Sequence, residues 1–528
     1  MKRSLLLLAL LLVVVLAIAA CNRNGNDDTP VEEEALPQWA PDPDPTPQVD
    51  PVEPEEPEIP AELTYISWIV IDGGRPAHDA VVDEVNRLLI ERHPEAGLQL
   101  DLRMLDWGEY SDLLNMMFLG GEVFDITYMA QWMPPFFAPV AARGDLAPLN
   151  DLLPIYGPNI MNMVPSETWF NAVSHGGNIY GVPIVYQLSQ SPGLTFHAYY
   201  VDKHGFDYQS VRSLADVEPF LEIIAQYEPH LIPFLPGTGA SHLNPPHLVD
   251  SPLEDVDWWL QFNPITGEFT DGFEDEIRNM PYWRLMHDWF NRGFIALDAA
   301  SRTIWGDEIS TGQYAVMPNF AFVDDGITNS ERYGFRVYDV RLFTNSPIRT
   351  ADIQNTVLGI SRTSQHPHLA LRMIDIVWSD PLITNTLNYG IQGIHWNFID
   401  EASMMIEVTD AGREEWFNGE ASYQIAGLYH RFGTPEQPRE GFEATLRANR
   451  EGAPSALLGF NADFSAVETE AAAFHAIVAE VQHLLNTGTV DPDVFVPEVI
   501  NRLEAAGRSA LRVDIEAQIT AWQEVNPR

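Results

Sequence analysis

The sequence contains a single cysteine, Cys21, among 528 residues. One cysteine excludes an intrachain disulfide, and it excludes every metal site built from several thiolates. No disulfide framework or Cys-rich metal centre therefore stabilises this chain.

Positively charged residues are also scarce. The chain has 29 Lys and Arg residues against 76 Asp and Glu residues, which gives a formal net charge of −47. Lys2 and Lys203 are the two lysines of the sequence, so nearly every cationic side chain is an arginine. A body this acidic argues against nucleic acid or anionic lipid as a partner. We interpret the shortage of lysine as a compositional bias.

The long apolar runs are confined to the amino terminus. Basic residues precede the run Leu5–Ala20, which at 16 residues is shorter than the roughly 20 that a membrane-spanning helix needs. The pattern predicts a signal peptide over residues 1–20, with a transmembrane anchor as the weaker alternative. The ending Ile18-Ala19-Ala20-Cys21 resembles a bacterial lipobox, which implies cleavage before Cys21 and attachment of lipid, such as palmitate, to its thiol.

Residues 21–62 lack the composition of a folded segment. Ten prolines lie between Pro30 and Pro60, interleaved with Asp and Glu. Too few apolar residues are present to form a core, and proline with like charges keeps a chain extended. The segment is predicted to be a disordered acidic tether.

Folded structure is predicted from residue 63 onwards, and the 45% of apolar residues is ample for packed cores. At this length two or three domains are expected. Strand patterns at Leu63–Val70, Leu98–Met104 and Val123–Met129 alternate with helical patterns that start at Pro76 and at Tyr110. This β-α-β-α-β order predicts a parallel sheet.

The strand over 123–129 ends in side chains suited to a ligand. Tyr128, Gln131 and Trp132 follow one another there, before Pro134 and Pro135. Open α/β sheets bind ligands beyond the carboxyl ends of their strands. These residues form either a small-molecule platform or ordinary packing at the edge of the core.

The second half of the chain gives a coarser pattern. Residues 236–280 are rich in Pro, Gly and Asp and are predicted to be mainly loop. The carboxyl terminus is predicted to be helical over Glu468–Leu485, Pro497–Ala506 and Leu511–Val525. A capping box at Ser465 is expected to open the first of these helices.

Seven segments, in this order and behind a lipobox, resemble one known family. They are Asp106-Trp107-Gly108-Glu109-Tyr110, Gly121–Tyr128, Gly177–Pro183, Val201–Asp207, Thr311–Met317, Asn388–Trp396, and the pair Asp491-Pro492-Asp493 and Ala505-Ala506-Gly507. Each segment alone is a weak match to the family, whereas all seven in this order are a specific match. The sequence resembles the extracellular solute-binding proteins of ABC importers, family 1, in the lipoprotein subfamily that has its own C-terminal domain of unknown function.

The resemblance implies a periplasmic-binding-protein-like clamp of type II, an α/β fold whose two lobes each contain a mixed or parallel sheet flanked by helices. By analogy the first lobe is 63–185 plus 345–392, and the second lobe is 186–344 plus 393–528. It further implies a monomer, anchored by lipid at the extracellular face of the cell membrane through Cys21. Such a protein delivers solute to ABC-transporter permease subunits.

A carbohydrate site needs flat aromatic rings for the C–H faces of sugars and polar groups for their hydroxyls. The chain has 14 tryptophans, and several stand near predicted strand ends. Each could instead pack in the core, as is expected for the tryptophans at 258, 259, 283, 289 and 378. The candidate ligand-binding residues are Trp68, Tyr128, Gln131, Trp132, Tyr186, Asn319, Phe320, Gln392, His395 and Trp396.

The residue patterns give little support for catalysis, metal binding or a cofactor. Asp125 is expected to brace neighbouring backbone, although contact with solute is the alternative. His395 lacks partners at metal-ligand spacing, and the acids from Asp271 to Glu276 lack the spacing of an EF-hand. The sequence therefore predicts no metal, no cofactor and no catalytic residue.

Three functions of different classes remain. The leading hypothesis is a non-enzymatic binding protein that captures a sugar or oligosaccharide, with a neutral saccharide favoured by the acidity of the chain. The second is a surface glycoside hydrolase, which would need two carboxylates flanking a cleft. The third is a solute-sensing lipoprotein partnered with a signalling receptor.

Overall fold

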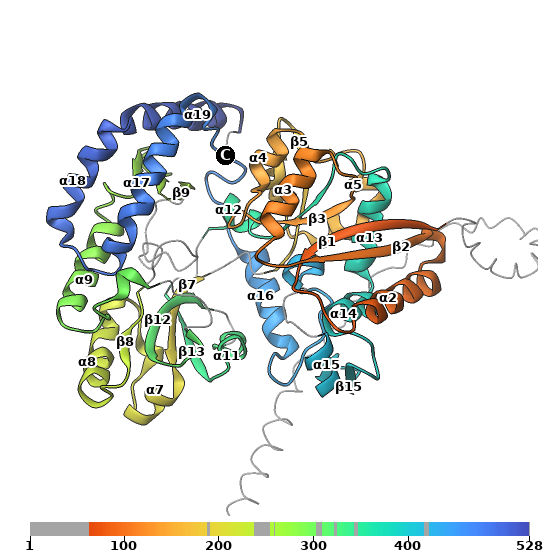
Figure 1. Ribbon diagram of the computed structural model, residues 1–528, viewed down its shortest axis with the longest axis horizontal. Coiled ribbons are helices and arrows are strands. Elements are labelled where there is room, and N and C mark those ends of the chain that lie inside the picture. Colours follow the sequence, from red (N-terminus) through yellow and green to blue (C-terminus); the bar gives the residue numbers. More distant parts are fainter. Residues whose placement is uncertain are drawn as a thin grey trace, which may run out of the picture. The chain divides into compact units, whose positions relative to one another are not determined.

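The computed structural model describes most of the folded chain. The described residues are 63–186, 191–236, 254–257, 259–302, 309–321, 325–342, 347–416 and 422–526. The predicted signal peptide, Cys21 and the tether therefore lie outside the described residues. Pro57–Arg528 forms one compact unit, and within it two large hydrophobic cores define a first lobe and a second lobe (Figure 1).

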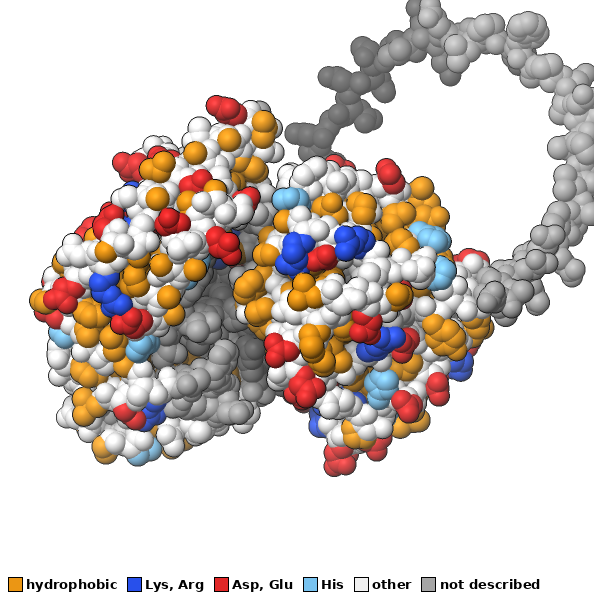
Figure 2. All heavy atoms as spheres, turned by 45° about the horizontal axis from the view of Figure 1, so that its top comes forward, with side chains coloured by type: hydrophobic (Ala, Val, Ile, Leu, Met, Phe, Trp, Pro, Cys, Tyr) orange, Lys and Arg blue, Asp and Glu red, His pale blue; other side chains and the backbone are white. Residues whose placement is uncertain are grey.

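The surface of this unit is acidic. On the face seen in Figure 2, carboxylates outnumber Lys and Arg side chains, in keeping with the net charge of −47. Both kinds of charge are interspersed with apolar side chains.

The first lobe is organised around a five-stranded sheet in the order β2-β1-β3-β14-β6. Its strands are β1 (Thr64–Ile71), β2 (Leu98–Leu105), β3 (Ile126–Met129), β6 (Gly181–Pro183) and β14 (Val357–Ile360). The pairing of β1 with both β2 and β3 is parallel, as the β-α-β-α-β pattern predicts. β14 pairs antiparallel with β3 and β6, so the sheet is mixed.

Amphipathic helices cover this sheet. In α2 (His78–Arg92) the apolar residues Val81, Val85, Leu88 and Leu89 recur at helical spacing, and all are buried. The other helices are α3 (Tyr110–Gly120), α4 (Phe137–Ala142), α5 (Leu153–Tyr156), α6 (Pro158–Met163), α12 (Thr350–Gln354), α13 (Pro367–Ser379), α14 (Pro381–Tyr389), α15 (Asp410–Glu415) and α16 (Arg439–Glu451). Two hairpins, β4 (Ser174–His175) with β5 (Asn178–Ile179) and β15 (Trp396–Asp400) with β16 (Met405–Val408), complete the lobe.

The second lobe contains two sheets. The larger has the order β13-β7-β12-β8 and comprises β7 (Ser191–His197), β8 (Ile232–Phe234), β12 (Tyr314–Ala321) and β13 (Val337–Arg341). The smaller comprises β9 (Glu254–Asp257), β10 (Leu260–Phe262) and β11 (Phe269–Asp271). This sheet lies in residues 236–280, which were predicted to be mainly loop. Its strands form because Trp259 is buried and stacks on Phe273, with ring centroids 5.0 Å apart. Burial of these rings outweighs the turn-forming composition around them.

The helices of the second lobe come from distant parts of the chain. They are α7 (Ala198–His204), α8 (Glu218–Tyr227), α9 (Asn279–Asn291), α11 (Ile327–Tyr333), α17 (Glu468–Asn486), α18 (Pro492–Ala505) and α19 (Arg508–Val525). All three predicted C-terminal helices are present, but the expected cap at Ser465 is wrong. Ser465 opens a short 3₁₀ turn over Ser465–Val467, and α17 follows it without a side-chain cap. α18 begins earlier than predicted because Asp491 caps it by accepting a hydrogen bond from the Asp493 amide.

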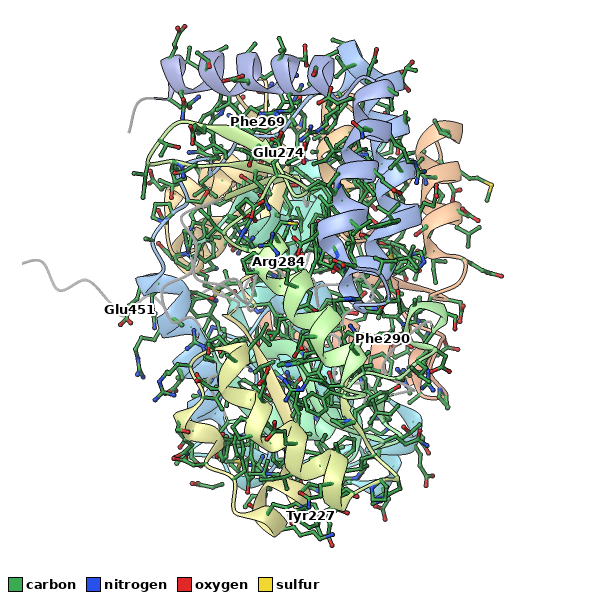
Figure 3. The ribbon with its side chains drawn as sticks, turned by 90° about the vertical axis from the view of Figure 1, so that its left-hand side faces the viewer. Tyr227, Phe269, Glu274, Arg284, Phe290 and Glu451 are labelled. Atoms are coloured by element: carbon green, nitrogen blue, oxygen red, sulfur yellow. The ribbon has the colours of Figure 1, made fainter. Side chains whose placement is uncertain are left out.

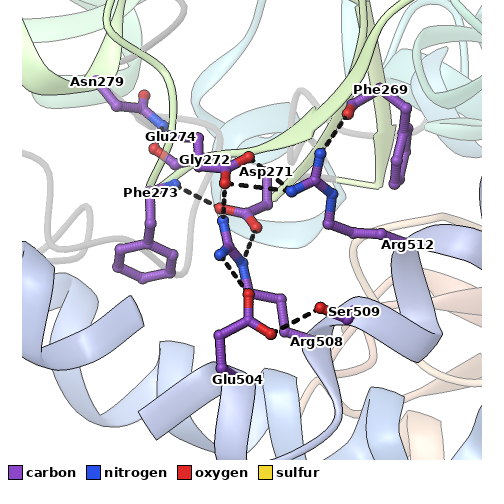
Figure 4. A network of polar contacts seen from close by, with 10 residues as sticks. All are labelled: Phe269, Asp271, Gly272, Phe273, Glu274, Asn279, Glu504, Arg508, Ser509 and Arg512. Carbon is purple, nitrogen blue, oxygen red and sulfur yellow. Dashed lines mark hydrogen bonds and ion pairs between the residues drawn. The ribbon is translucent and has the colours of Figure 1, made fainter. Parts of the chain in front are cut away.

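The C-terminal helices are joined to the smaller sheet by ion pairs. Arg508, only 3% exposed, donates from Nε to Asp271 at 2.5 Å and from Nη1 to Glu504 at 2.9 Å (Figure 4). Its Nη2 lies 2.7 Å from Glu274. Burial raises the pKa of the Asp271 carboxyl, while Arg508 opposes the rise. On α9, Arg284 (labelled in Figure 3) pairs with Asp493 of α18 at 2.7 Å, so α18 and α19 are tied to the segment 269–291.

One part of the predicted lobe division differs from the structure. Residues 393–458 were expected in the second lobe, yet the side chains of Trp416, Ile425, Phe442 and Leu458 belong to the core of the first lobe. The next apolar residue, Phe460, belongs to the core of the second lobe. The apolar residues of 416–446 complete the first core instead of forming a separate one, so the chain passes between the lobes near residues 455–460 and not near 392.

Asp125 braces the first lobe, as the sequence predicts. Its Oδ2 accepts hydrogen bonds from the Ser67 amide at 2.9 Å and from the Ser67 hydroxyl at 3.0 Å. Its Oδ1 accepts a hydrogen bond from the Ser364 hydroxyl at 2.5 Å. The carboxylate, buried with its residue 8% exposed, thus links β1 and the residues after β14 to the start of β3.

Asp125→Asn is expected to lower the free energy of unfolding by about 1–3 kcal/mol, because the buried hydrogen bonds from Ser67 and Ser364 would lose their charged acceptor. Chemical denaturation followed by circular dichroism measures the change. Asp79→Asn is the matched control, since the Asp79 side chain is fully exposed. Equal stability of the two variants would contradict the bracing role.

Candidate functional site

The candidate site lies at one edge of the sheet in the first lobe. Because β1, β2 and β3 are parallel, their carboxyl ends share that edge, and β6 runs in the same direction through its antiparallel pairing with β14. Trp107 follows β2, Trp132 follows β3 and Tyr186 follows β6. The edge where α/β sheets bind ligands therefore carries three aromatic residues in this lobe.

Two of these aromatics form a stacked pair. The rings of Trp107 and Trp132 lie with centroids 6.2 Å apart at an interplanar angle of 25°. Trp107 is 45% exposed, whereas Trp132 is partly buried against the first core. An indole face held parallel to a second indole and open to solvent presents a flat apolar surface of the kind that sugar rings stack on.

Asn355, just before β14, accepts the hydrogen bonds that position the polar groups at this edge. Its backbone oxygen accepts hydrogen bonds from the Tyr128 hydroxyl at 3.1 Å and from the Trp132 indole N–H at 3.2 Å. Its side-chain oxygen accepts one from the Gln131 amide at 2.9 Å. Asn355 itself is buried, so it fixes the positions of the three predicted residues from β3 and its following turn.

A tyrosine cluster continues the edge towards β6. Tyr423 meets the ring of Tyr128 edge-on at 5.7 Å and lies 6.0 Å from the ring of Tyr186. Next to it, the side chain of Gln424 bonds both the amide and the carbonyl of Ile71 at the end of β1. The residues that line a small pocket here are Val70, Ile71, Asp72, Leu102, Met104, Leu387, Trp416, Gln424 and Ile425.

Sequence reasoning missed Trp107 and Tyr423 as candidates. Trp107 stands directly after a predicted strand, as Trp132 does, so its position was an available signal. Tyr423 lies in residues 393–458, which were assigned to the other lobe, so its neighbours could not be foreseen. The structure brings Tyr128, Gln131, Trp132 and Tyr186 together, with Tyr128 completely buried, and their contact with a ligand stays a prediction.

Trp68, His395 and Trp396 are packed within the first lobe. Trp68 and Trp396 are completely buried, and His395 is 2% exposed. The indole N–H of Trp396 donates to the Gly390 carbonyl at 2.8 Å, and Nδ1 of His395 accepts from the Ile391 amide at 2.9 Å. Both residues thereby shape the turn that contains Gln392, which is exposed. Their contact with a ligand stays a prediction.

The two candidates from the second lobe lie on β12. Asn319 is buried and donates hydrogen bonds to the Thr195 hydroxyl at 3.1 Å and to the Tyr333 hydroxyl at 2.9 Å. Phe320 pairs through its backbone with Pro192 of β7, and its side chain lies outside the described part. Asn319 therefore supports the sheet of the second lobe, and its role towards solute is untested.

The described residues contain neither a cluster of metal ligands nor a helix able to cross a membrane. No group of three or more His, Cys, Asp or Glu residues in that part of the chain is arranged to hold a metal ion. Within the same residues, none of the helices combines the length and the apolar character needed to cross a bilayer. The tryptophans at 259, 283, 289 and 378 are core residues, as predicted, while Trp258 is not described.

Comparison with known proteins identifies a relative in sequence and several in structure. Residues 456–524 match DUF3502, a domain of unknown function. A carbohydrate ABC transporter substrate-binding protein of Streptococcus pneumoniae serotype 4 is 23% identical over 443 residues, 82% of this chain and 86% of that protein. The match to DUF3502 begins where the chain passes into the second lobe.

Solved structures extend the likeness over nearly the whole folded chain. The N-glycan transport solute-binding protein NgtS of Streptococcus pneumoniae has a TM-score of 0.77 at 19% identity and covers 87% of this chain and 99% of that one. An HMO-binding, ABC-transporter-associated solute-binding protein of Bifidobacterium longum infantis has a TM-score of 0.59 at 13% identity, covering 87% and 98%. These matches confirm the resemblance to solute-binding proteins of ABC transporters. The chain has the two-lobed α/β fold of extracellular solute-binding proteins and carries DUF3502 at its carboxyl end.

Proposed function

We propose that this chain is the solute-binding component of an ABC importer, which captures an oligosaccharide between its two lobes and delivers it to membrane permease subunits. The observation that carries the proposal is the stacked pair Trp107–Trp132 at the carboxyl edge of the first sheet, with its open indole face. The relatives support the same class of solute: one is a carbohydrate ABC transporter substrate-binding protein, and NgtS has been solved with Man1GlcNAc and Man5GlcNAc.

Binding would shift the two lobes towards a closed state by contacts with both. In the first lobe the solute would stack on Trp107, and hydroxyl groups would exchange hydrogen bonds with Gln131. No carboxylate pair is needed for this role, and the chain would act without catalysis. A glycoside hydrolase would instead release product, so the absence of turnover during binding separates the two functions.

The proposal is tested by calorimetric titration of the full-length chain with a panel of neutral and acidic oligosaccharides. Trp107→Ala is expected to weaken binding roughly 10- to 100-fold, as truncation of a central aromatic contact does. It should change the free energy of unfolding by less than about 1 kcal/mol, because the ring is largely outside the core. Chromatography of the mixtures after titration detects any cleavage.

Tyr65→Ala provides the matched control, because Tyr65 is 64% exposed near the opposite, amino-terminal end of β1. Its affinity is expected to equal that of the unmodified chain. Equal affinities of the Trp107 and Tyr65 variants would overturn the site. No detectable binding of any oligosaccharide in the panel would overturn the carbohydrate function.

We also propose that the chain is a lipoprotein, tethered to the extracellular face of the cell membrane through Cys21. The lipobox-like ending before Cys21 and the acidic proline-rich segment behind it support this placement. The tether would hold an acidic body away from an anionic surface. The folded unit would act as a monomer.

Cys21→Ser is expected to abolish labelling of the chain by radioactive palmitate and to move it from the membrane fraction to the medium, because the only thiol is lost. Asn22→Ser is the control, since it leaves the thiol in place. Retention of the Cys21 variant in the membrane fraction would contradict lipid anchoring at this residue.

A further inference from the structure

Of the three buried arginines among the described residues, two are compensated by carboxylates, and the third donates hydrogen bonds to neutral side chains. Arg278, whose side chain is 4% exposed, lies 2.9 Å from Asp275. Arg508 is surrounded by Asp271, Glu274 and Glu504. With 76 acidic residues against 29 cationic ones, a counter-charge is easy to supply anywhere in the fold. A guanidinium with a buried nitrogen that has no hydrogen-bond partner at all is therefore conspicuous.

Arg341, the last residue of β13, is such a group. Its Nε is buried and has no hydrogen-bond partner, and the side chain makes no ion pair with any described residue. Desolvation lowers the pKa of this guanidinium. The neighbouring carboxylate on the same face of β13, Asp339, already accepts hydrogen bonds from Thr195 at 2.6 Å and Asn329 at 2.7 Å.

The place of Arg341 in the chain ties it to the connections between the lobes. It pairs with Gly193 near the start of β7, directly after the first passage of the chain into this lobe. The chain leaves the lobe again just after Arg341, because Ile348 already belongs to the first core. A Cβ on Gly193 would lie 2.2 Å from the Val340 carbonyl, so the two strands approach closely and hold the backbone of Arg341 in place.

An uncompensated guanidinium destabilises the free protein through its lost hydration, and it regains stability when an anion arrives. Its planar fork matches a carboxylate with two parallel hydrogen bonds. We propose that Arg341 receives a carboxylate of the solute, which makes the ligand an acidic oligosaccharide and corrects the neutral saccharide favoured by net charge alone. The inference rests on the proposed function and names the substrate class of that site.

The test uses paired ligands that differ only in charge. Oligomers of galacturonate, mannuronate and glucuronate are titrated calorimetrically into the full-length chain beside their methyl esters of the same length. The free acid of at least one pair is expected to bind about tenfold or more tightly than its ester. Arg341→Gln should abolish that preference, and Arg341→Lys should restore only part of it, because lysine keeps the charge and loses the fork.

Arg336→Gln is the control for a general change in charge, since Arg336 is exposed and five residues away. It should leave the preference for the acid unchanged. Thermal unfolding of all variants shows whether they are folded. An Arg341→Gln variant that loses stability but keeps the preference would assign Arg341 to a contact within the chain and overturn the inference.

The two proposals fail in different ways. Binding of esters and neutral oligosaccharides as tight as that of the acids would overturn the acidic ligand and leave the carbohydrate-binding function standing. Failure of every saccharide to bind would overturn both.

Discussion

The parallel pairing of β1 with β2 and β3 is the constraint on which the site depends. It brings three strand ends to one edge, so that Trp107 and Trp132, 25 residues apart in the sequence, stack on each other. Asp125 fixes the start of β3 against β1, and Asn355 fixes the turn after β3 by hydrogen bonds. Without that pairing the aromatic residues would lie on separate surfaces and present no common face.

Local pattern was enough to predict the elements of the first lobe. Apolar residues at helical or strand spacing placed the starts of α2, α3, β1 and β2 within one or two residues of their positions. The fold class followed from their order and from the family resemblance. The smaller sheet of the second lobe was missed because its strands have three or four residues each, too few to show a period, and because packing of Trp259 on Phe273 is a tertiary effect.

The site was only partly predictable for a similar reason. Strand-end position placed Tyr128, Gln131 and Trp132 at one edge, since the geometry of a parallel sheet dictates where such residues gather, but it did not show that Tyr128 is completely buried. Tyr423 could not be found this way, because its place depends on which core the residues 393–458 join. That choice is made by the apolar side chains of 416–446 against the first lobe, a long-range packing preference that no local spacing encodes.

The position of a single charged side chain bears on function more than the net charge of the chain does. Net charge alone favours a neutral ligand, yet the position of Arg341 points to an acidic one, because a local guanidinium at short range outweighs screened carboxylates farther away.

The proposed function requires that the stacked tryptophans bind saccharide. The decisive measurement is a crystal structure of the chain with a bound oligosaccharide. We expect a sugar ring lying flat on the exposed face of Trp107. A saccharide bound elsewhere, with Trp107 and Trp132 untouched, would contradict it.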